Sequence, residues 1–340
     1  MNMDQFIDQL LKKALEKGIE AAEVYLVSRD SFRAMSQLGE VSDYTVNKTN
    51  GLSLRGLYKG KMGYAATEAL DESAIDQLTD AVIDSASLIE DEDVREIYKG
   101  DASYPKIDQY NPALDQVEET KKIGFLLEME RKAMAVDERI VQVAQNAFST
   151  SSSERRIVNT YGMNLKYRDN SAFAYTYVVA KEGDRVSTGM GFDISRDFDK
   201  LDMGKIVGDA TRDALFMLSA KPVPSGKYRV IIQNLAMPDL LACFSPVFSA
   251  EEAQRGTSLL AGKEGAVVAS EIVTLMDDPL LKGGLATCPF DDEGVAARTK
   301  AVIENGKLTT LLHNLKTARK AGVQSTGNAS KAGYTAPIEV

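Results

Sequence analysis

The most restrictive feature of this sequence is what it lacks: 340 residues include one histidine, two cysteines and no tryptophan. Catalytic zinc sites generally use two or three His ligands, and Ser or Cys nucleophiles usually need a His base. Cys243 and Cys288 are far apart and form no CxxC motif, so they predict neither a disulfide framework nor a cysteine-built zinc site. His313 has no ligand-type residue beside it at a suitable spacing, and we interpret it as structural or solvated. A self-sufficient hydrolase is therefore not expected unless Lys or carboxylates replace His.

A surplus of positive charge and a long apolar run are also missing. Forty Lys and Arg against fifty Asp and Glu give a net charge of −10, and the isoelectric point is near 4.9. No diffuse positive field attracts phosphate backbones or anionic lipids. No stretch approaches the roughly 20 apolar residues of a membrane span, and the N-terminus alternates polar with apolar residues, unlike a signal peptide. We therefore expect a cytoplasmic protein that binds neither nucleic acid nor membrane directly.

The length and the hydrophobic content of 44% predict about two domains with sizeable cores. Short polar or Gly-containing turns separate the strand-like runs, which favours antiparallel meanders over parallel crossovers. The expected fold class is α+β, with mostly antiparallel sheets flanked by helices. We place the boundary in the Pro- and Gly-containing segment 222–226. It separates an N-terminal α+β domain, residues 1–221, from a C-terminal β-rich domain, residues 222–340.

Hydrophobic periodicity predicts the individual elements. Helices are expected from Met3 to Gly18, after an Asp71 cap, from about Glu118, and over 203–218 and 238–244. Strands are expected at 23–27, 32–38, 44–46, 52–58, 62–67, 140–148, 155–160, 165–168, 172–180, 186–192, 228–232 and 266–276. Asn305-Gly306 predicts a type I′ hairpin between 300–303 and 308–312. A helix-plus-meander unit thus occurs twice, which indicates a structural duplication.

Two acidic turns, Asp277–Pro279 and Asp291–Gly294, are candidates for binding a divalent cation, because hard cations prefer clustered carboxylates. Neither has the alternating ligand positions of a calcium loop, and we interpret both as solvated turns. Carboxylates this close would raise one another's pKa if they were buried. Gly256-Thr257-Ser258 matches no phosphate-binding loop, and the hydroxyl-rich runs 149–153 and 325–328 have ordinary loop composition. The residues alone indicate a soluble two-domain protein without a legible active site.

A series of short motifs nevertheless occurs in a fixed order along the chain. In the second half they are Pro224–Ile231, Gly256–Ser258, Gly262-Lys263, Val268–Ser270, Val273-Thr274, Asp277–Pro279, Asp291–Gly294, Arg298-Thr299, Val302–Glu304 and Ser325–Asn328. In the first half they are Gly51–Thr67, which includes Arg55-Gly56 and Gly63–Ala65, and the turn Asn159–Gly162. Together these motifs resemble the TldD/PmbA family of metallopeptidases, once called modulators of DNA gyrase.

The resemblance implies proteolysis of peptides by a paired complex, in which a TldD-type subunit carries a zinc-binding HExxxH helix and a PmbA-type, or TldE, subunit lacks it. Alignment through the preceding strand and leucines places the two His and the Glu of that motif at Ala242, Val247 and Cys243, respectively. These side chains supply neither two imidazoles nor a carboxylate base. The chain is therefore identified as PmbA/TldE-like, with no catalytic, cofactor-binding or metal-binding residue of its own. The family-motif positions Gly256, Thr257, Ser258, Asp291, Asp292, Glu293 and Gly294 are carried over without an assigned role.

The favoured hypothesis is the non-metal subunit of a cytosolic TldD/TldE-type metalloprotease complex that degrades or matures unfolded peptides. Zinc is then expected in a TldD-like partner, in a heterodimer or larger assembly, and a homodimer is also open. One alternative is a non-enzymatic adaptor that modulates gyrase or toxin–antitoxin proteins, and another is a cryptic hydrolase that uses Ser, Thr or Lys. Family members generally continue well past Ser325–Asn328, so that the C-terminal domain is expected to be incomplete at Val340.

Overall fold

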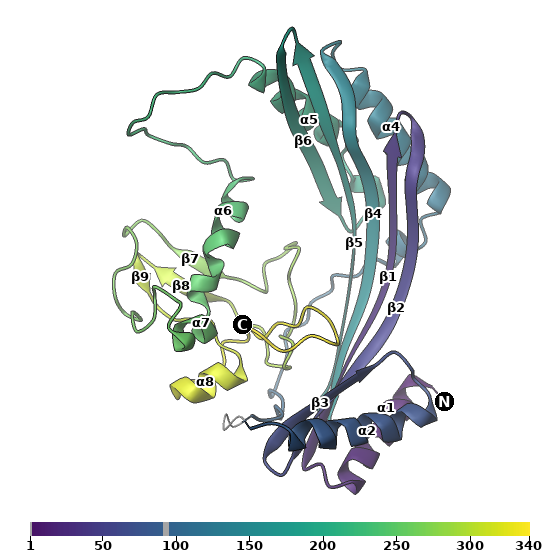
Figure 1. Cartoon of the computed structure of the whole chain (residues 1–340), viewed down its shortest axis with the longest axis vertical. Helices are drawn as coiled ribbons and strands as arrows, with labels where there is room; N and C mark the ends of the chain where they lie inside the picture. Colours follow the sequence, from purple (N-terminus) through teal and green to yellow (C-terminus); the bar gives the residue numbers. More distant parts are fainter. Residues whose placement is uncertain (1, 91–94) are drawn as a thin grey trace.

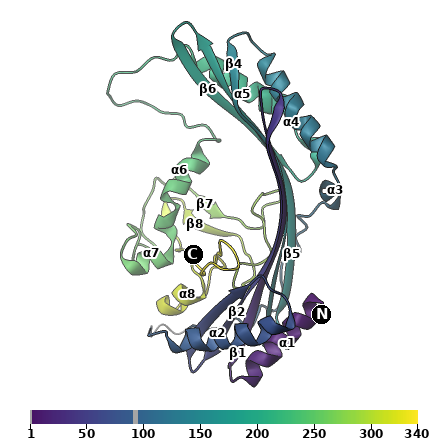
Figure 2. The same cartoon turned by 45° about the vertical axis from the view of Figure 1, so that its right-hand side comes forward.

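One curved antiparallel sheet dominates the computed structural model, which describes residues 2–90 and 95–340. Its six strands lie in the order β3-β2-β1-β4-β5-β6. They are β1 (Ala21–Gln37), β2 (Glu40–Tyr58), β3 (Lys61–Thr67), β4 (Ile140–Asn159), β5 (Asn164–Glu182) and β6 (Arg185–Ser195). Figures 1 and 2 show this sheet bending around the C-terminal third of the chain. The predicted α+β fold with antiparallel sheets is confirmed.

Each half of the sheet is built from the same order of elements. Helices α1 (Met3–Glu16) and α2 (Glu72–Ser87) flank β1–β3, and α4 (Glu119–Met134) and α5 (Met203–Met217) flank β4–β6. A short helix α3 (Pro112–Asp115) and a 3₁₀ turn η1 (Phe198–Lys200) lie in the connections. Pairing of β1 with β4 joins the two halves into one sheet. The helix-plus-meander unit inferred from the sequence therefore occurs twice around this central pair.

The strands are longer than predicted because polar residues continue them. Residues 29–31, 50–51 and 149–153 were expected in turns or loops, yet all of them pair within β1, β2 and β4. Asp30 lies opposite Lys48, and Ser31 lies opposite Ser151. Paired polar side chains of this kind stabilise a ladder whose face is open to solvent. Local composition predicts turns here, but pairing with the neighbouring strands makes these residues part of the sheet.

The two halves have separate hydrophobic cores between the sheet and its helices. The first contains apolar residues of α1, α2, β1 and β2, among them Phe6, Leu10, Val24, Leu54 and Val82. The second contains residues of α4, α5, β4 and β5, among them Leu126, Met129, Phe148, Val178 and Ala210. These residues recur at the helical and strand periods, as expected for one buried face of each element. The helices therefore cover one face of the sheet, and the C-terminal part of the chain lies on the other face.

Edge strand β3 approaches α2 so closely that only glycine fits at position 63. A Cβ atom on Gly63 would lie 1.9 Å from the carbonyl oxygen of Val82. We expect Gly63→Ala to lower the free energy of unfolding by about 1–3 kcal/mol, because the helix must move away from the strand. Urea unfolding followed by circular dichroism measures this. Gly124→Ala in α4 is the control: its Cβ would meet open space, and no loss is expected.

Residues 237–340 form a smaller unit on the inner side of the curve (Figure 1). It contains α6 (Met237–Phe244), η2 (Ser245–Phe248), α7 (Ala250–Arg255), β7 (Leu275–Asp277), β8 (Lys300–Glu304), β9 (Lys307–Leu308) and α8 (Leu315–Ala321). Asn305 and Gly306 connect β8 to β9 with φ values of 47° and 78°, which confirms the predicted type I′ hairpin. Ala250, Ile303 and Leu308 belong to its small core.

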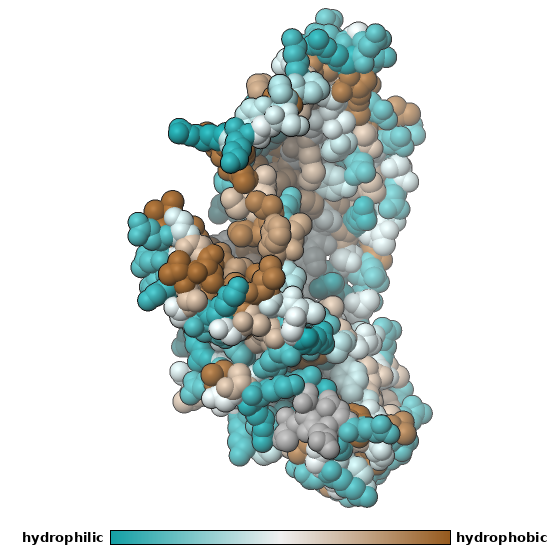
Figure 3. Space-filling model, turned by 60° about the vertical axis from the view of Figure 1, so that its left-hand side comes forward, coloured by the Kyte–Doolittle hydropathy of each residue, from teal (hydrophilic) through white to brown (hydrophobic). Residues whose placement is uncertain are grey.

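Two strand predictions in this region are wrong. Residues 228–232 lie in an irregular segment between α5 and α6 where Ile231 is 92% exposed, and only the end of 266–276 is strand. Apolar composition favours a strand, but a strand also needs a neighbour that completes its backbone hydrogen bonds. Residues 222–340 were expected to be β-rich and instead carry three short strands beside their helices. Figure 3 shows the exposed apolar side chains that result on this side of the molecule.

Candidate functional site

The acidic turn Asp291–Gly294 lies buried where the C-terminal unit meets the curved sheet. Asp291, Asp292 and Glu293 are only 5%, 6% and 5% exposed. The prediction of a solvated turn is therefore wrong for this motif. The composition of a turn does not reveal which other part of the protein will pack on it. Here Tyr25 of β1, Arg55 of β2 and Arg155 of β4 contact the turn.

Asp292 bonds both to strands of the sheet and to a later loop of the C-terminal unit. Its Oδ1 accepts a hydrogen bond of 2.9 Å from the Tyr25 hydroxyl and contacts Nη1 of Arg155. Its Oδ2 accepts a 2.7 Å hydrogen bond from the backbone N–H of Lys331. Arg155 also donates from Nη2 to the carbonyl of Phe290 and lies over the Phe290 ring. One carboxylate thus connects two strands of the sheet with two loops of the C-terminal unit.

Glu293 makes a second buried ion pair with the sheet. Its Oε1 lies 3.3 Å from Nη1 of Arg55, and its Oε2 accepts from the backbone N–H of Leu315 in the first turn of α8. Nε of Arg55 is 2.8 Å from Oε1 of Glu23, a residue of β1 that is 1% exposed. Arg55 therefore lies between a carboxylate of its own sheet and one of the C-terminal unit.

Asp291 organises the turn itself. Its Oδ1 accepts from the backbone N–H groups of Glu293 and Val295, and its Oδ2 accepts from Ala329. Burial, together with the nearby charge of Glu293, raises the pKa of Asp291 to about 7. The turn therefore contains an acid whose protonation changes near neutral pH.

Lys331 enters the same junction between aromatic rings. Its Nζ lies 4.4 Å from the centre of the Tyr25 ring and 5.1 Å from that of Tyr64, and it donates to Oγ of Ser53 at 3.0 Å. Burial and the charge of Arg55 lower the pKa of Lys331 to about 8. A Lys–Ser contact of this kind is the geometry of a base and a nucleophile. Ser53 is only 2% exposed, however, so that a substrate does not reach its hydroxyl.

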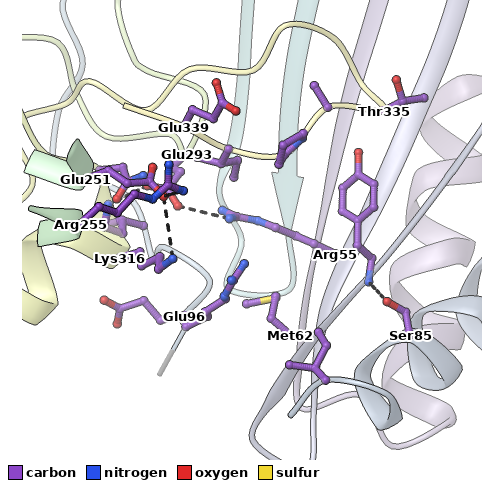
Figure 4. Close-up of a pocket in the computed structure, with 18 residues that line it drawn as sticks. Arg55, Met62, Ser85, Glu96, Glu251, Arg255, Glu293, Lys316, Thr335 and Glu339 are labelled. Carbon is purple, nitrogen blue, oxygen red and sulfur yellow. Dashed lines mark hydrogen bonds and ion pairs between the residues drawn. The ribbon is translucent and has the colours of Figure 1, made fainter. Parts of the chain in front are cut away.

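A cavity of about 500 Å³ opens beside Arg55 and Glu293 (Figure 4). It is lined by Arg55, Met62, Tyr64, Ser85, Ile89, Arg95, Glu96, Glu251, Arg255, Glu293, Asn314, Leu315, Lys316 and residues 335–339. One wall comes from β2, β3 and α2, and the opposite wall comes from α7, α8 and the segment after Tyr334. Its size is typical of pockets that hold small molecules.

The other motif positions lie away from this cavity. Gly256 ends α7 with a φ of 79°, a conformation that favours glycine. Thr257 donates from Oγ1 to the carbonyl of Glu252, and Ser258 donates to that of Val247. These residues cap α7 and fix its connection to η2. The structure thus assigns Gly256–Ser258 a local structural role and does not bring them into the lining of the cavity.

Ala242 and Cys243 are exposed on α6, and Val247 lies in η2. None of the three lines the cavity. His313 is buried; its backbone groups bond to Ser325 and Thr326, and burial lowers its pKa. Across residues 2–90 and 95–340, no three His, Cys, Asp or Glu side chains are arranged to hold a metal ion. In the same ranges no helix is long and apolar enough to cross a membrane.

The charged residues that the sheet contributes to this junction were not predicted as site residues. Arg55 and Arg155 were placed in predicted strands, and Glu23 began another, but no role was assigned to any of them. The available signal was a charged residue flanked by apolar ones, as in Leu54-Arg55-Gly56 and Ala22-Glu23-Val24. A charge at such a position is buried and therefore needs a partner. Which partner it has is decided by chain segments that are distant in sequence.

Comparison with known proteins gives these residues a family context. Three family models match consecutive parts of the chain: the PmbA/TldA metallopeptidase domain 1 at 22–86, the central domain at 112–218 and the C-terminal domain at 225–340. A metalloprotease of Methanocaldococcus jannaschii is 28% identical, over 96% of this chain and 73% of that protein. Metalloprotease PmbA of Escherichia coli O157:H7 is 25% identical over the same shares.

A solved structure from Thermotoga maritima, which carries the name of a DNA gyrase modulator, has the same fold. It superimposes with a TM-score of 0.91 and 28% sequence identity, and the match covers 99% of this chain and 76% of that one. The family models together span most of the sequence, in the order that the motifs predict. The chain therefore belongs to the PmbA/TldD metallopeptidase family.

Proposed function

We propose that this chain is the metal-free, PmbA/TldE-type subunit of a cytoplasmic metalloprotease complex that degrades or matures unfolded peptides. The observation that carries the proposal is the chemistry of α6 and η2. Where zinc-bearing relatives are expected to present two His and one Glu, this chain has Ala242, Val247 and Cys243. These side chains do not fit a zinc ion, since two of them have no ligand atom and the third is a lone thiol.

Surface chemistry supports pairing with a second subunit. Helix α6 exposes Leu240, Leu241 and Phe244, and no residue of this helix is buried. Such a concentration of exposed apolar side chains is typical of protein-interaction surfaces. A TldD-like subunit would bring the zinc-bound water and its base, whereas this chain would contribute the curved sheet and its C-terminal unit as one wall of the peptide chamber.

The test is reconstitution with a TldD-like protein from the same genome and an unfolded peptide as substrate. We expect cleavage only when both proteins are present, and about one zinc per TldD-like chain and none in this chain by metal analysis. Cleavage by this chain alone would favour a cryptic hydrolase, and binding without cleavage would favour the adaptor function. About one tightly held zinc per copy of this chain would contradict the proposed division of roles.

A further inference from the structure

The inward face of β5 and β6 carries apolar side chains that remain partly exposed. On β5 the even-numbered residues from 172 to 180 are buried beneath α4 and α5, so the odd-numbered residues face the other way. Tyr167 lies on this same inward face and donates a hydrogen bond to the C-terminal unit at the carbonyl of Thr287. Further along, the face presents six residues of β5 and β6, which we call the aromatic strip: Phe173, Tyr175, Tyr177, Met190, Phe192 and Ile194.

The aromatic strip is a continuous surface. The centre of the Phe173 ring lies 5.7 Å from that of Tyr175 and 6.0 Å from that of Phe192. Met190 is 46% exposed, and the other residues of the strip are half-buried. The solvated face of an antiparallel sheet is normally polar, so an apolar patch on it indicates an interaction surface.

The first half of the sheet shows what covers the equivalent surface there. The inward-facing residues in the middle of β2 are Gly51, Ser53 and Arg55. Each of them contacts a residue of the C-terminal unit, and these residues are Tyr334, Lys331 and Glu293, respectively. In this half, the C-terminal unit of the same chain therefore covers the inward face of the sheet.

The internal duplication matches this covered surface to the aromatic strip. Gly63 of β3 and Gly189 of β6 occupy equivalent places, because a Cβ atom on either would collide with a carbonyl oxygen of the helix beside it. Gly63 pairs with Gly56, and Gly189 pairs with Val178. Alignment of the two pairs places the inward-facing residues of β2 at the positions of the three β5 residues of the strip. Two equivalent faces are thus present, and the described part of the chain has one C-terminal unit to cover them.

Helix α6 is the part of the C-terminal unit that fits the uncovered face. It lies on the inward side of the curved sheet (Figures 1 and 2). Its residues Leu240, Leu241 and Phe244 are exposed and form an apolar, convex surface. The ion pairs of Arg55 and Arg155 hold the C-terminal unit on the first half of the sheet, so that α6 is not free to cover the strip of its own chain.

Charges beside the two surfaces are complementary. Asp239 is the single charged residue of α6, and it is exposed. Arg33 is exposed on β1, in the row of paired residues that runs through Ser149 to Phe173 of the strip. Opposite charges at the edge of two apolar surfaces favour their association and fix its orientation.

We propose that two copies of this chain form a dimer with two-fold symmetry, in which α6 of each copy packs on the aromatic strip of the other. The symmetry repeats the contact, so that both helices and both strips are covered. The second copy supplies to the second half of the sheet what the chain's own C-terminal unit supplies to the first half. The proposal goes beyond the proposed function, because it concerns the chain without a TldD-like protein.

Sedimentation equilibrium of the full chain tests the association, and we expect a dimer whose fraction rises with protein concentration. Leu241→Glu alters the helix and Met190→Glu alters the strip, both at exposed positions. Each should weaken the dimer about tenfold or more, because it places a charge in an apolar contact. Phe216→Glu is the matched control: Phe216 is 73% exposed on α5, outside both surfaces, and this variant should dimerise as the wild type does. Circular dichroism checks that the variants fold.

Cross-linking identifies the contact itself, because Cys243 is an exposed thiol of α6. A chain with Met190→Cys and Cys243→Ser is mixed with the wild type, both in a Cys288→Ser background, and a short bismaleimide is added. We expect a product of two chains in which mass spectrometry finds position 243 of one copy joined to position 190 of the other. Phe216→Cys in place of Met190→Cys is expected to give no such product.

A chain that is monomeric at every concentration would overturn the proposal. A dimer that neither Leu241→Glu nor Met190→Glu weakens, or one that gives no cross-link between positions 243 and 190, would overturn it as well. Cleavage with the TldD-like protein is assayed separately. Cleavage that needs a chain found to be monomeric on its own rejects this dimer alone, whereas the expected dimer without any cleavage rejects the protease complex alone.

Discussion

Replacement of Arg55 by Met is expected to lower the free energy of unfolding by about 3–5 kcal/mol, because it leaves two buried carboxylates without their partner. Glu23 and Glu293 are both buried, and each of them makes an ion pair with Arg55. One of these acids belongs to β1 and the other to the C-terminal unit. The variant should therefore also loosen the contact between the units, which limited proteolysis would detect as faster cleavage near residues 221–235.

Urea unfolding with the full chain measures the loss. Arg29→Met is the matched control, since Arg29 is exposed on β1 and its replacement should change stability by no more than about 0.5 kcal/mol. Adding Glu23→Gln and Glu293→Gln to the Arg55→Met variant should recover part of the loss, because these changes remove the unpaired charges. A loss below about 1 kcal/mol for Arg55→Met would show that this cluster does not hold the two units together.

Stability should also fall as pH rises through the range in which Asp291 titrates. Burial and the neighbouring Glu293 raise the pKa of Asp291 from 3.8 to about 7 in the folded chain. Between these values the folded chain keeps a proton that the unfolded chain has lost. The stabilising contribution of Asp291 is therefore fully present below about pH 4 and is lost as the pH approaches 7, with a slope of up to about 1.4 kcal/mol per pH unit.

Asp291→Asn separates this effect from the titration of other carboxylates. The amide does not titrate. In the wild type the N–H of Ala329 donates to Oδ2 of Asp291, so the NH₂ group of Asn would place a second donor opposite that N–H. We expect the variant to be less stable than the wild type at pH 4 and the difference to shrink steadily towards pH 7. Unfolding free energies at intervals across this range provide the measurement. A difference that stays constant with pH would mean that Asp291 is already ionised in the folded chain at pH 4.

The sequence by itself determined those elements that depend on residues close together in the chain, and the side-chain types available at each position. Asp71 caps α2, Asn305-Gly306 forms the predicted hairpin, and the apolar stripe of α1 lies in the first core. These features depend on residues a few positions apart, so the local pattern contains the information they need. The side chains at positions 242, 243 and 247 likewise follow from the sequence alone, because a ligand type is a property of a single residue.

Only the tertiary structure decided which polar residues are buried together. Glu293 meets Arg55 across 238 positions of sequence, and Asp292 meets Tyr25 across 267. The same acidic turn would be solvated if the curved sheet did not cover it, and residues 228–232 would be a strand if a neighbour completed their hydrogen bonds. Burial and strand pairing are properties of two surfaces in contact, and the sequence of either surface does not specify the other.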